Sequence, residues 1–290
     1  MDWFYFILVS TILSGMNSFL LKGTAIKKIN KFYIAYSYAC VQFGLTFLLF
    51  MFSKPKTDNF LVALGFGFGI AICFYSRLLC DLKAFEYIPT NILLPVASLN
   101  VLVVVLYGYF FLNEKIKALQ FLGIIVLLTS VILINMQARK STGNDIKNLK
   151  KGLMFGFLGI IPSSASNILN KYAVTYVDVN FISTIVLFLI VIISSTLYFA
   201  KFGKEHKALT KEHKKEVYKY SLIIGTFAFL SYVFYLNSFK IGPISLAMAI
   251  SSSSIIIAVL LSAWKYKEEL SLARMVYILF ALTGIILIRI

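Results

Sequence analysis

Residues 82–134 read LKAFEYIPTNILLPVASLNVLVVVLYGYFFLNEKIKALQFLGIIVLLTSVILI, and residues 236–288 read LNSFKIGPISLAMAISSSSIIIAVLLSAWKYKEELSLARMVYILFALTGIILI. The two stretches align without gaps and are identical at 13 of 53 positions. Chance matches of leucine and isoleucine are frequent in so apolar a chain. The evidence for a repeat therefore depends mainly on the pairs Pro89/Pro243 and Glu114/Glu268. The sequence therefore predicts an internally duplicated architecture.

The repeat lies within a series of long apolar stretches. They fall at about 2–22, 32–53, 60–80, 87–112, 118–137, 151–171, 180–201, 219–239, 242–265 and 271–289. Each has about the 20 residues with which a helix crosses a ~30 Å hydrocarbon core, whereas barrel strands would alternate over ~10 residues. Because every backbone amide in lipid needs a partner, we expect an all-α integral membrane protein with ten transmembrane helices.

A polar linker divides these ten spans into two sets of five. We expect a first repeat at residues 1–140, a linker at 141–150 and a second repeat at 151–290. Five is an odd number of crossings, so the second repeat must enter the bilayer from the side opposite to the first. Such inverted repeats are typical of transporters, which place a substrate site near the midplane and open alternately to either side.

Composition excludes several other classes of protein. Of the 290 residues, 60% are hydrophobic and 14% charged, and the mean hydropathy is +0.86. Soluble domains carry about 45–50% apolar residues, so a soluble enzyme is not expected. The N-terminal stretch lacks a basic n-region and a small-residue cleavage site, and we expect it to be the first span, not a cleaved signal.

The net charge of +16 does not indicate nucleic acid as a partner, because most lysines lie in short connectors beside apolar spans. There they contact lipid headgroups, so the expected partners are membrane lipids and a small-molecule substrate, with the chain a monomer or a homodimer. The three cysteines form no C-x-x-C motif, and no disulfide framework, metal site or cofactor is expected.

The basic residues also bear on orientation. Connectors after spans one, three, five, seven and nine hold about 21 Lys and Arg residues, against about 7 in the other connectors and termini. The positive-inside rule then predicts that both termini lie outside the cytoplasm.

Three local features of the chain are similar to known motifs. The stretch Gly15 to Lys22, GMNSFLLK, is similar to the pattern W-G-x-N-F-x-x-x-K, and NILNK at 167–171 repeats its tail. The turn LNEKI at 112–116, followed by QFLG at 120–123, is similar to L-G-E-x-L/I…Q-x-x-G, and YKEEL at 266–270 is its second copy.

A third likeness is the placement of Ala84-Phe85 and Ser238-Phe239 just ahead of spans four and nine. Together these features resemble the EamA-like transporters, a ten-helix branch of the drug/metabolite transporter superfamily, over nearly the whole chain. The resemblance implies a membrane carrier of small metabolites, with amino-acid export as the leading activity. It also implies cytoplasmic termini, contrary to the charge count, so orientation stays open.

Polar and aromatic residues inside the spans are the candidates for substrate contact, because an intramembrane polar group needs a partner. The asparagines and serines of spans one and six lie at similar places in the two repeats, spans four and nine have their apolar runs interrupted, and tyrosines lie in spans three and eight. The predicted substrate-binding residues are Asn17, Tyr75, Asn91, Pro95, Ser98, Asn100, Ser164, Asn167, Tyr232, Tyr235, Ser251 and Ser252.

Each candidate also has a purely structural interpretation. The amides and hydroxyls are equally typical of contacts that hold membrane helices together, Pro95 of a packing kink, and the tyrosines of interfacial belts. Lys22 and Lys171 either carry charge at the cavity mouth or anchor helix ends at the headgroups. Glu114 and Glu268 are expected at the start of the helix that follows each of them.

Ionisable residues are expected only near the ends of the spans. Arg77 and Asp81 are included in this group and are explained by snorkelling or capping. Without a carboxylate at the midplane, exchange or coupling through groups at the span ends is favoured over a buried proton site.

The combined interpretation is a carrier, not an enzyme, because no nucleophile–base or paired-carboxylate constellation is present. The expected substrate is a small polar or amphipathic metabolite, foremost an amino acid or a related compound. The alternatives are a sugar-phosphate or nucleotide-sugar exchanger, which would need two or more converging cations, and a membrane protein that handles lipid-linked sugars.

Overall fold

The computed structural model describes residues 2–27, 29–55, 59–88, 90–137, 148–208, 211–266 and 271–290. In this part of the chain the regular structure is helical, in the order α1 (Trp3–Ile26), α2 (Lys31–Ser53), α3 (Phe60–Phe85), α4 (Thr90–Ser98), α5 (Asn100–Phe111), α6 (Ala118–Gln137), α7 (Leu149–Tyr176), α8 (Val179–Ala208), α9 (Lys211–Ile241), α10 (Ile244–Ser252), α11 (Ser254–Tyr266) and α12 (Leu272–Arg289). The prediction of an all-α protein is confirmed. Most of the predicted linker lies outside the described residues.

The chain is a multi-pass membrane protein. Within the described residues, eight helical stretches are long and apolar enough to cross a bilayer, and one of them, Ile244–Tyr266, joins α10 to α11. Two further apolar stretches, Pro95–Phe111 and Ala118–Ile134, fall in the predicted fourth and fifth spans. Large apolar side chains such as Phe52 and Leu61 are more than four-fifths exposed, as expected of surfaces that face lipid.

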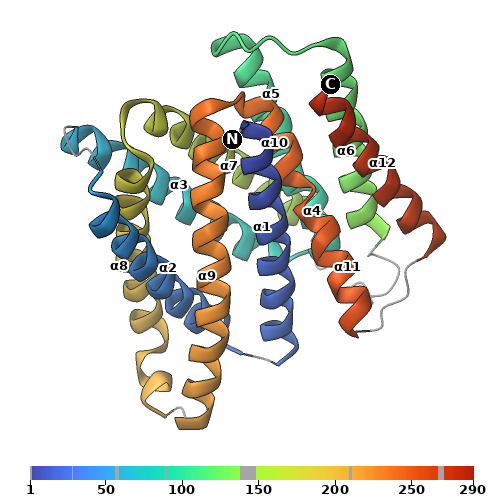
Figure 1. Cartoon of the computed structure of the whole chain (residues 1–290). Helices are drawn as coiled ribbons and strands as arrows, with labels where there is room; N and C mark the ends of the chain where they lie inside the picture. Colours follow the sequence, from blue (N-terminus) through green and yellow to red (C-terminus); the bar gives the residue numbers. More distant parts are fainter. Residues whose placement is uncertain are drawn as a thin grey trace.

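The two halves pack against one another reciprocally (Figure 1). The first helix of each half lies against the third helix of the other, α1 against α9 and α7 against α3. The helices α2 and α8 also pair, as do α6 and α12. In Figure 1, α1 begins at the end that holds both termini and α7 begins at the opposite end, as an inverted repeat requires.

The fourth span of each half is broken at the same place. The alignment of residues 82–134 with 236–288 pairs Leu99, which separates α4 from α5, with Ser253, which separates α10 from α11. At both breaks the backbone forms a tight turn, with Leu99 N donating to Val96 O at 3.1 Å and Ser253 N to Ile250 O at 3.0 Å. Since the second copy has Ala249 opposite Pro95, proline is not what the break requires.

The fifth spans cross at two glycines. A Cβ on Gly123 of α6 would lie 2.8 Å from the carbonyl oxygen of Gly284 in α12, so only a residue without a side chain allows this approach. Near the same edge, Arg289 donates to Asp2 at 2.8 Å and joins the two ends of the chain.

Candidate functional site

Polar side chains form a stripe along α7. Ser163, Asn167, Asn170 and Lys171 recur every three or four residues, so they lie on one face of the helix. The stripe begins near the middle of α7 and runs toward the end of the bundle with the termini. Ser163 and Asn170 are each 5% exposed, so the face is turned into the protein and not toward lipid.

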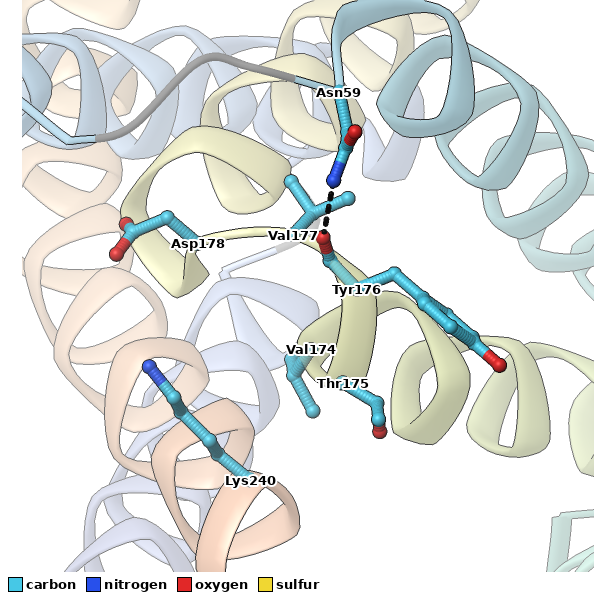
Figure 2. A pocket seen from close by; sticks show the side chains of 7 residues that line it. All are labelled: Asn59, Val174, Thr175, Tyr176, Val177, Asp178 and Lys240. Atoms are coloured by element: carbon cyan, nitrogen blue, oxygen red, sulfur yellow. Dashed lines mark hydrogen bonds between the residues drawn. The ribbon is translucent and has the colours of Figure 1, made fainter.

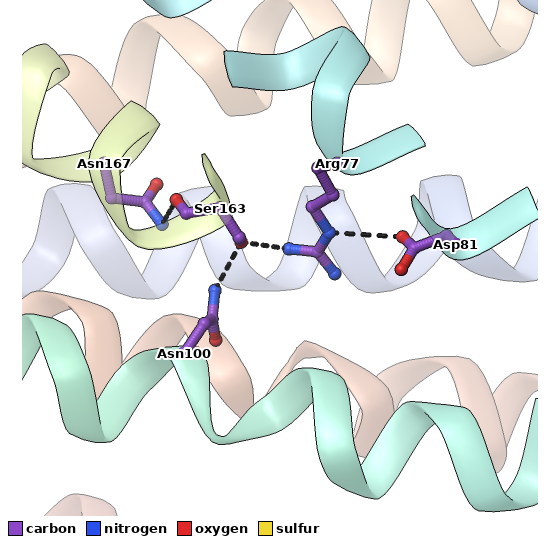
Figure 3. Close-up of polar contacts among 5 residues, drawn as sticks. All are labelled: Arg77, Asp81, Asn100, Ser163 and Asn167. Atoms are coloured by element: carbon purple, nitrogen blue, oxygen red, sulfur yellow. Dashed lines mark hydrogen bonds and ion pairs between the residues drawn. The ribbon is translucent and has the colours of Figure 1, made fainter. Parts of the chain in front are cut away.

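At the middle of the bundle the stripe meets an arginine (Figure 3). Arg77 of α3 donates through Nη1 to the Ser163 hydroxyl, and through Nε to Asp81 at 3.2 Å. Asn100, the first residue of α5, donates to the same hydroxyl at 2.8 Å, and Asn167 donates to the Ser163 carbonyl at 3.0 Å. We call these five residues, Arg77, Asp81, Asn100, Ser163 and Asn167, the central network.

The position of Arg77 corrects the expectation from sequence. With a rise of 1.5 Å per residue, Arg77 lies about 12 Å before the end of α3, and its side chain reaches Ser163 near mid-helix. Snorkelling to the headgroups therefore does not explain it. Asp81, one turn closer to the helix end, is its ion-pair partner, so a guanidinium and a carboxylate lie together beside α7.

Two tyrosines of α9 extend the stripe on the terminal side. Tyr235 donates to Asn167 Oδ1 at 2.7 Å, and Tyr232 donates to Asn170 Oδ1 at 3.0 Å. The sequence-predicted residues Asn100, Asn167, Tyr232 and Tyr235 are thus brought together. Ser164 joins them by donating to the Asn100 carbonyl at 3.2 Å.

The final list of predicted substrate-binding residues left out Arg77, Asp81, Ser163 and Asn170. The signal for three of them was present in the sequence. Ser163 and Asn170 share the helical spacing of Asn167, and an ionisable residue within an apolar helix is by default a candidate for a functional site.

Lys171 ends the stripe at the turn between α9 and α10. Its ammonium donates to the carbonyl oxygens of Phe239 at 2.6 Å and Gly242 at 2.8 Å. These carbonyls belong to the last turn of α9 and the residue after it, so Lys171 caps a helix end inside the protein. Neither of the two roles predicted for it, free charge at a cavity mouth or anchoring at headgroups, describes these contacts.

Glu114 holds the other side of the same turn. Its carboxylate accepts from the backbone nitrogens of Ile244 at 2.6 Å and Ser245 at 3.1 Å, the first residues of α10. The expectation that Glu114 caps the helix that follows it is therefore wrong, because it caps a helix of the other half. Its repeat partner Glu268 lies outside the described residues.

The remaining predicted residues lie apart from the central network. Tyr75 donates to the Ile190 carbonyl at 3.0 Å, which ties α3 to α8. Ser252 donates to Ala249 within its own helix, and Lys22 lies 5.6 Å from the ring centroid of Tyr266. Asn17 is distinctive, because its buried Oδ1 has no hydrogen-bond partner among the described residues.

Four other candidates are placed only by the backbone. Pro95 lies inside α4 one turn before the break, and Ser98 is the last residue of that helix. Asn91 also lies in α4, but its side chain is outside the described part of the structure. Ser251 lies in the last turn of α10, beside the break at Ser253.

The comparisons with known proteins agree with this architecture. The model of the EamA-like transporter family matches residues 1–136 and again residues 150–290. A solved structure, described only as the crystal structure of a protein, superposes with a TM-score of 0.70 over 97% of this chain and 98% of that chain. At 13% identity that likeness concerns the fold alone. No curated protein shows significant sequence similarity to the chain.

Proposed function

The chain belongs to the EamA-like transporter family, and since it is therefore a membrane carrier and not an enzyme, we propose that its substrate is a small zwitterion of the amino-acid class. The proposal places the substrate at the central network and has it exported by alternating access. The observation that carries it is the guanidinium of Arg77 at mid-bundle with the Asp81 carboxylate beside it.

An amino acid matches the charges of this pair. A guanidinium binds a carboxylate through two parallel hydrogen bonds, and a carboxylate accepts from an ammonium. Without substrate, Arg77 and Asp81 satisfy each other at 3.2 Å. An amino acid that inserts between them replaces one ion pair by two, so binding leaves no unpaired charge in a low-dielectric site.

The surrounding groups add polarity without net charge. Asn100, Asn167 and the Ser163 hydroxyl are neutral donors or acceptors, and Tyr235 presents both a ring and a hydroxyl. At this depth the described residues contribute a single cation, since Lys171 is engaged by the carbonyls of Phe239 and Gly242. A phosphate group favours two or more converging cations, which is why a sugar-phosphate or nucleotide-sugar substrate is disfavoured.

The broken spans support alternating access. Discontinuous helices at the interface between inverted repeats are a recurring means by which carriers build a midplane site and rearrange around it. Asn100 begins α5 directly after the break at Leu99 and contacts Ser163 in the other half. A change in the angle at this break would therefore move a residue of the central network.

The experiment is counterflow in liposomes that contain the purified protein. Liposomes are preloaded with one unlabelled amino acid at a time, and uptake of its labelled form is measured against empty liposomes, then repeated with sugar phosphates and nucleotide sugars. We expect saturable amino-acid uptake that Arg77→Gln reduces at least tenfold and Asp81→Asn reduces more mildly. Inside-out vesicles then give the direction of net flux.

Lys83→Gln is the matched control, because Lys83 lies on the same helix, is exposed and contacts only Glu86 at 3.3 Å among the described residues. It should leave uptake unchanged. Counterflow of sugar phosphates in place of amino acids would overturn the proposed substrate class while leaving the carrier assignment intact. Full amino-acid uptake by Arg77→Gln would overturn the proposed site.

A further inference from the structure

A pocket separate from the central network lies at the turn between α7 and α8 (Figure 2), toward the end of the bundle that holds the termini (Figure 1). Its volume is about 250 Å³, and its walls come from Asn59 before α3, residues 174–178 at the α7–α8 turn and Lys240 near the end of α9. A water occupies ~30 Å³ of liquid, so the pocket has the volume of about eight waters. That volume suits a small metabolite and not a nucleotide.

Two side chains of opposite charge line this pocket. Figure 2 shows the Lys240 ammonium and the Asp178 carboxylate on the same side of it. The ion pairs formed among the described residues involve neither of them. Asp178 Oδ1 accepts from the Asn180 backbone nitrogen at 2.8 Å at the start of α8, which fixes the carboxylate and leaves Oδ2 available.

The remaining wall is ordered and partly apolar. Asn59 donates to the Tyr176 carbonyl at 3.0 Å and so ties the start of α3 to the end of α7. Val174 and Val177, which are 2% and 6% exposed, are the apolar residues of the lining. A ligand with a short aliphatic part could therefore contact these valines while its charged groups meet Asp178 and Lys240.

The pocket lies at the outer end of the α7 stripe. Val174 follows Lys171 by one helical turn, and Lys240 follows Phe239, whose carbonyl accepts from Lys171. The sequence of polar groups from Ser163 through Asn167 and Lys171 thus reaches this pocket at the surface. A solute held here lies at the outer end of this series of polar groups.

We propose that this pocket is a second, outer binding site for a small zwitterion, with Asp178 accepting from its ammonium and Lys240 donating to its carboxylate. The proposal rests on the proposed function, since the ligand class is that of the central substrate. The pocket is open to solvent, where exposed charge pairs contribute little, so binding is expected at millimolar concentration.

The test measures protection of a cysteine placed in the pocket. Thr175→Cys is labelled with a charged maleimide in detergent, and the native cysteines Cys40, Cys73 and Cys80, which are half-buried, are measured in the parent protein as background. Alanine is the probe, and propionate and ethylamine are its analogues without the ammonium and without the carboxylate. We expect millimolar alanine to slow labelling and each analogue to need about tenfold more.

Charge-neutral variants in the same background identify the groups that bind. Asp178→Asn keeps an oxygen for the Asn180 amide and should abolish the advantage of alanine over propionate, and Lys240→Gln should abolish its advantage over ethylamine. Lys115→Gln is the control, as an exposed lysine at the same end outside the pocket. Equal protection by alanine and both analogues, or none by alanine, would overturn the proposal.

Two further arms distinguish the outer pocket from the central network and from a lipid-binding site. Arg77→Gln should leave protection at Thr175→Cys unchanged even where uptake is lost, so failure of the central site and failure of the outer site are distinguishable. Phosphatidylethanolamine headgroups also carry an ammonium and an anion, so labelling is repeated in nanodiscs of that lipid. Slow labelling that alanine does not alter there, together with no protection in detergent, would assign the pocket to lipid and overturn the proposal.

Discussion

The carboxylate of Glu114 lies 2.6 Å from the backbone nitrogen of Ile244, although Glu114 belongs to the first half of the chain and Ile244 to the second. The acid thus satisfies amide donors at the start of α10, which otherwise has Pro243 at its N-cap and no side-chain cap of its own. The turn that contains Glu114, which is one of the two copies of the repeated Glu motif, therefore joins the first half of the chain to the second.

Replacing Glu114 by alanine should lower stability by about 2–3 kcal/mol, because two amide donors at the start of α10 lose a charged acceptor. Glu114→Gln, which keeps one oxygen, should cost about 1 kcal/mol. Thermal unfolding in detergent measures both. Glu86→Ala is the control, since Glu86 is exposed and pairs only with Lys83 among the described residues. Equal melting of Glu114→Ala and Glu86→Ala would contradict the capping role.

Gly108 permits this contact, and Gly108→Ala should destabilise the protein by about 1–3 kcal/mol through overpacking. A Cβ at this position would lie 2.6 Å from Glu114 Oε2 and even closer to the Ser245 hydroxyl. Gly65→Ala, where a Cβ meets nothing within 4 Å, should be neutral or slightly stabilising. The two variants are compared by the fraction of folded protein against temperature. A Gly108→Ala protein as stable as Gly65→Ala would show that α5 and α10 can separate without cost.

Pro95→Ala should leave uptake close to that of the parent, with stability equal or higher. The second half breaks at Ser253 with Ala249 in the place of Pro95, so the turn at Leu99 should also persist without proline. Alanine is the better helix former by about 3 kcal/mol, and part of this difference should appear as stabilisation. The check is melting temperature together with counterflow. Loss of uptake with unchanged melting would instead give Pro95 the role in the substrate site that the sequence predicted.

Two of the asparagines predicted as substrate contacts, Asn17 and Asn167, should differ in how much their loss lowers stability. Asn167→Ala removes the acceptor of the Tyr235 hydroxyl and should cost about 1 kcal/mol, a typical value for polar contacts between membrane helices. Asn17→Ala removes a buried oxygen that has no partner among the described residues, so melting should stay constant or rise. Both should reduce uptake if both contact substrate. Reduced melting of Asn17→Ala would show that its amide holds helices together.

Sequence alone determined the number of spans, the helical class and the division into two inverted halves, and the family resemblance it carried is confirmed. These features follow from the length and composition of individual stretches of the chain, without regard to how the helices pack against one another. A stretch of about 20 apolar residues must become a helix in lipid, and an odd number of crossings per repeat must invert the second copy.

Tertiary structure decided which polar groups meet. The sequence placed Asn100, Asn167 and Tyr235 among the candidates, but it could not bring Arg77 to Ser163 or Glu114 to α10, because those contacts join different halves. Snorkelling and capping of the following helix are local roles that suit any charged residue near a span end. Only the packing of α3 against α7 brings Arg77 to the Ser163 hydroxyl, and only the packing of α5 against α10 brings Glu114 to the amides at the start of α10.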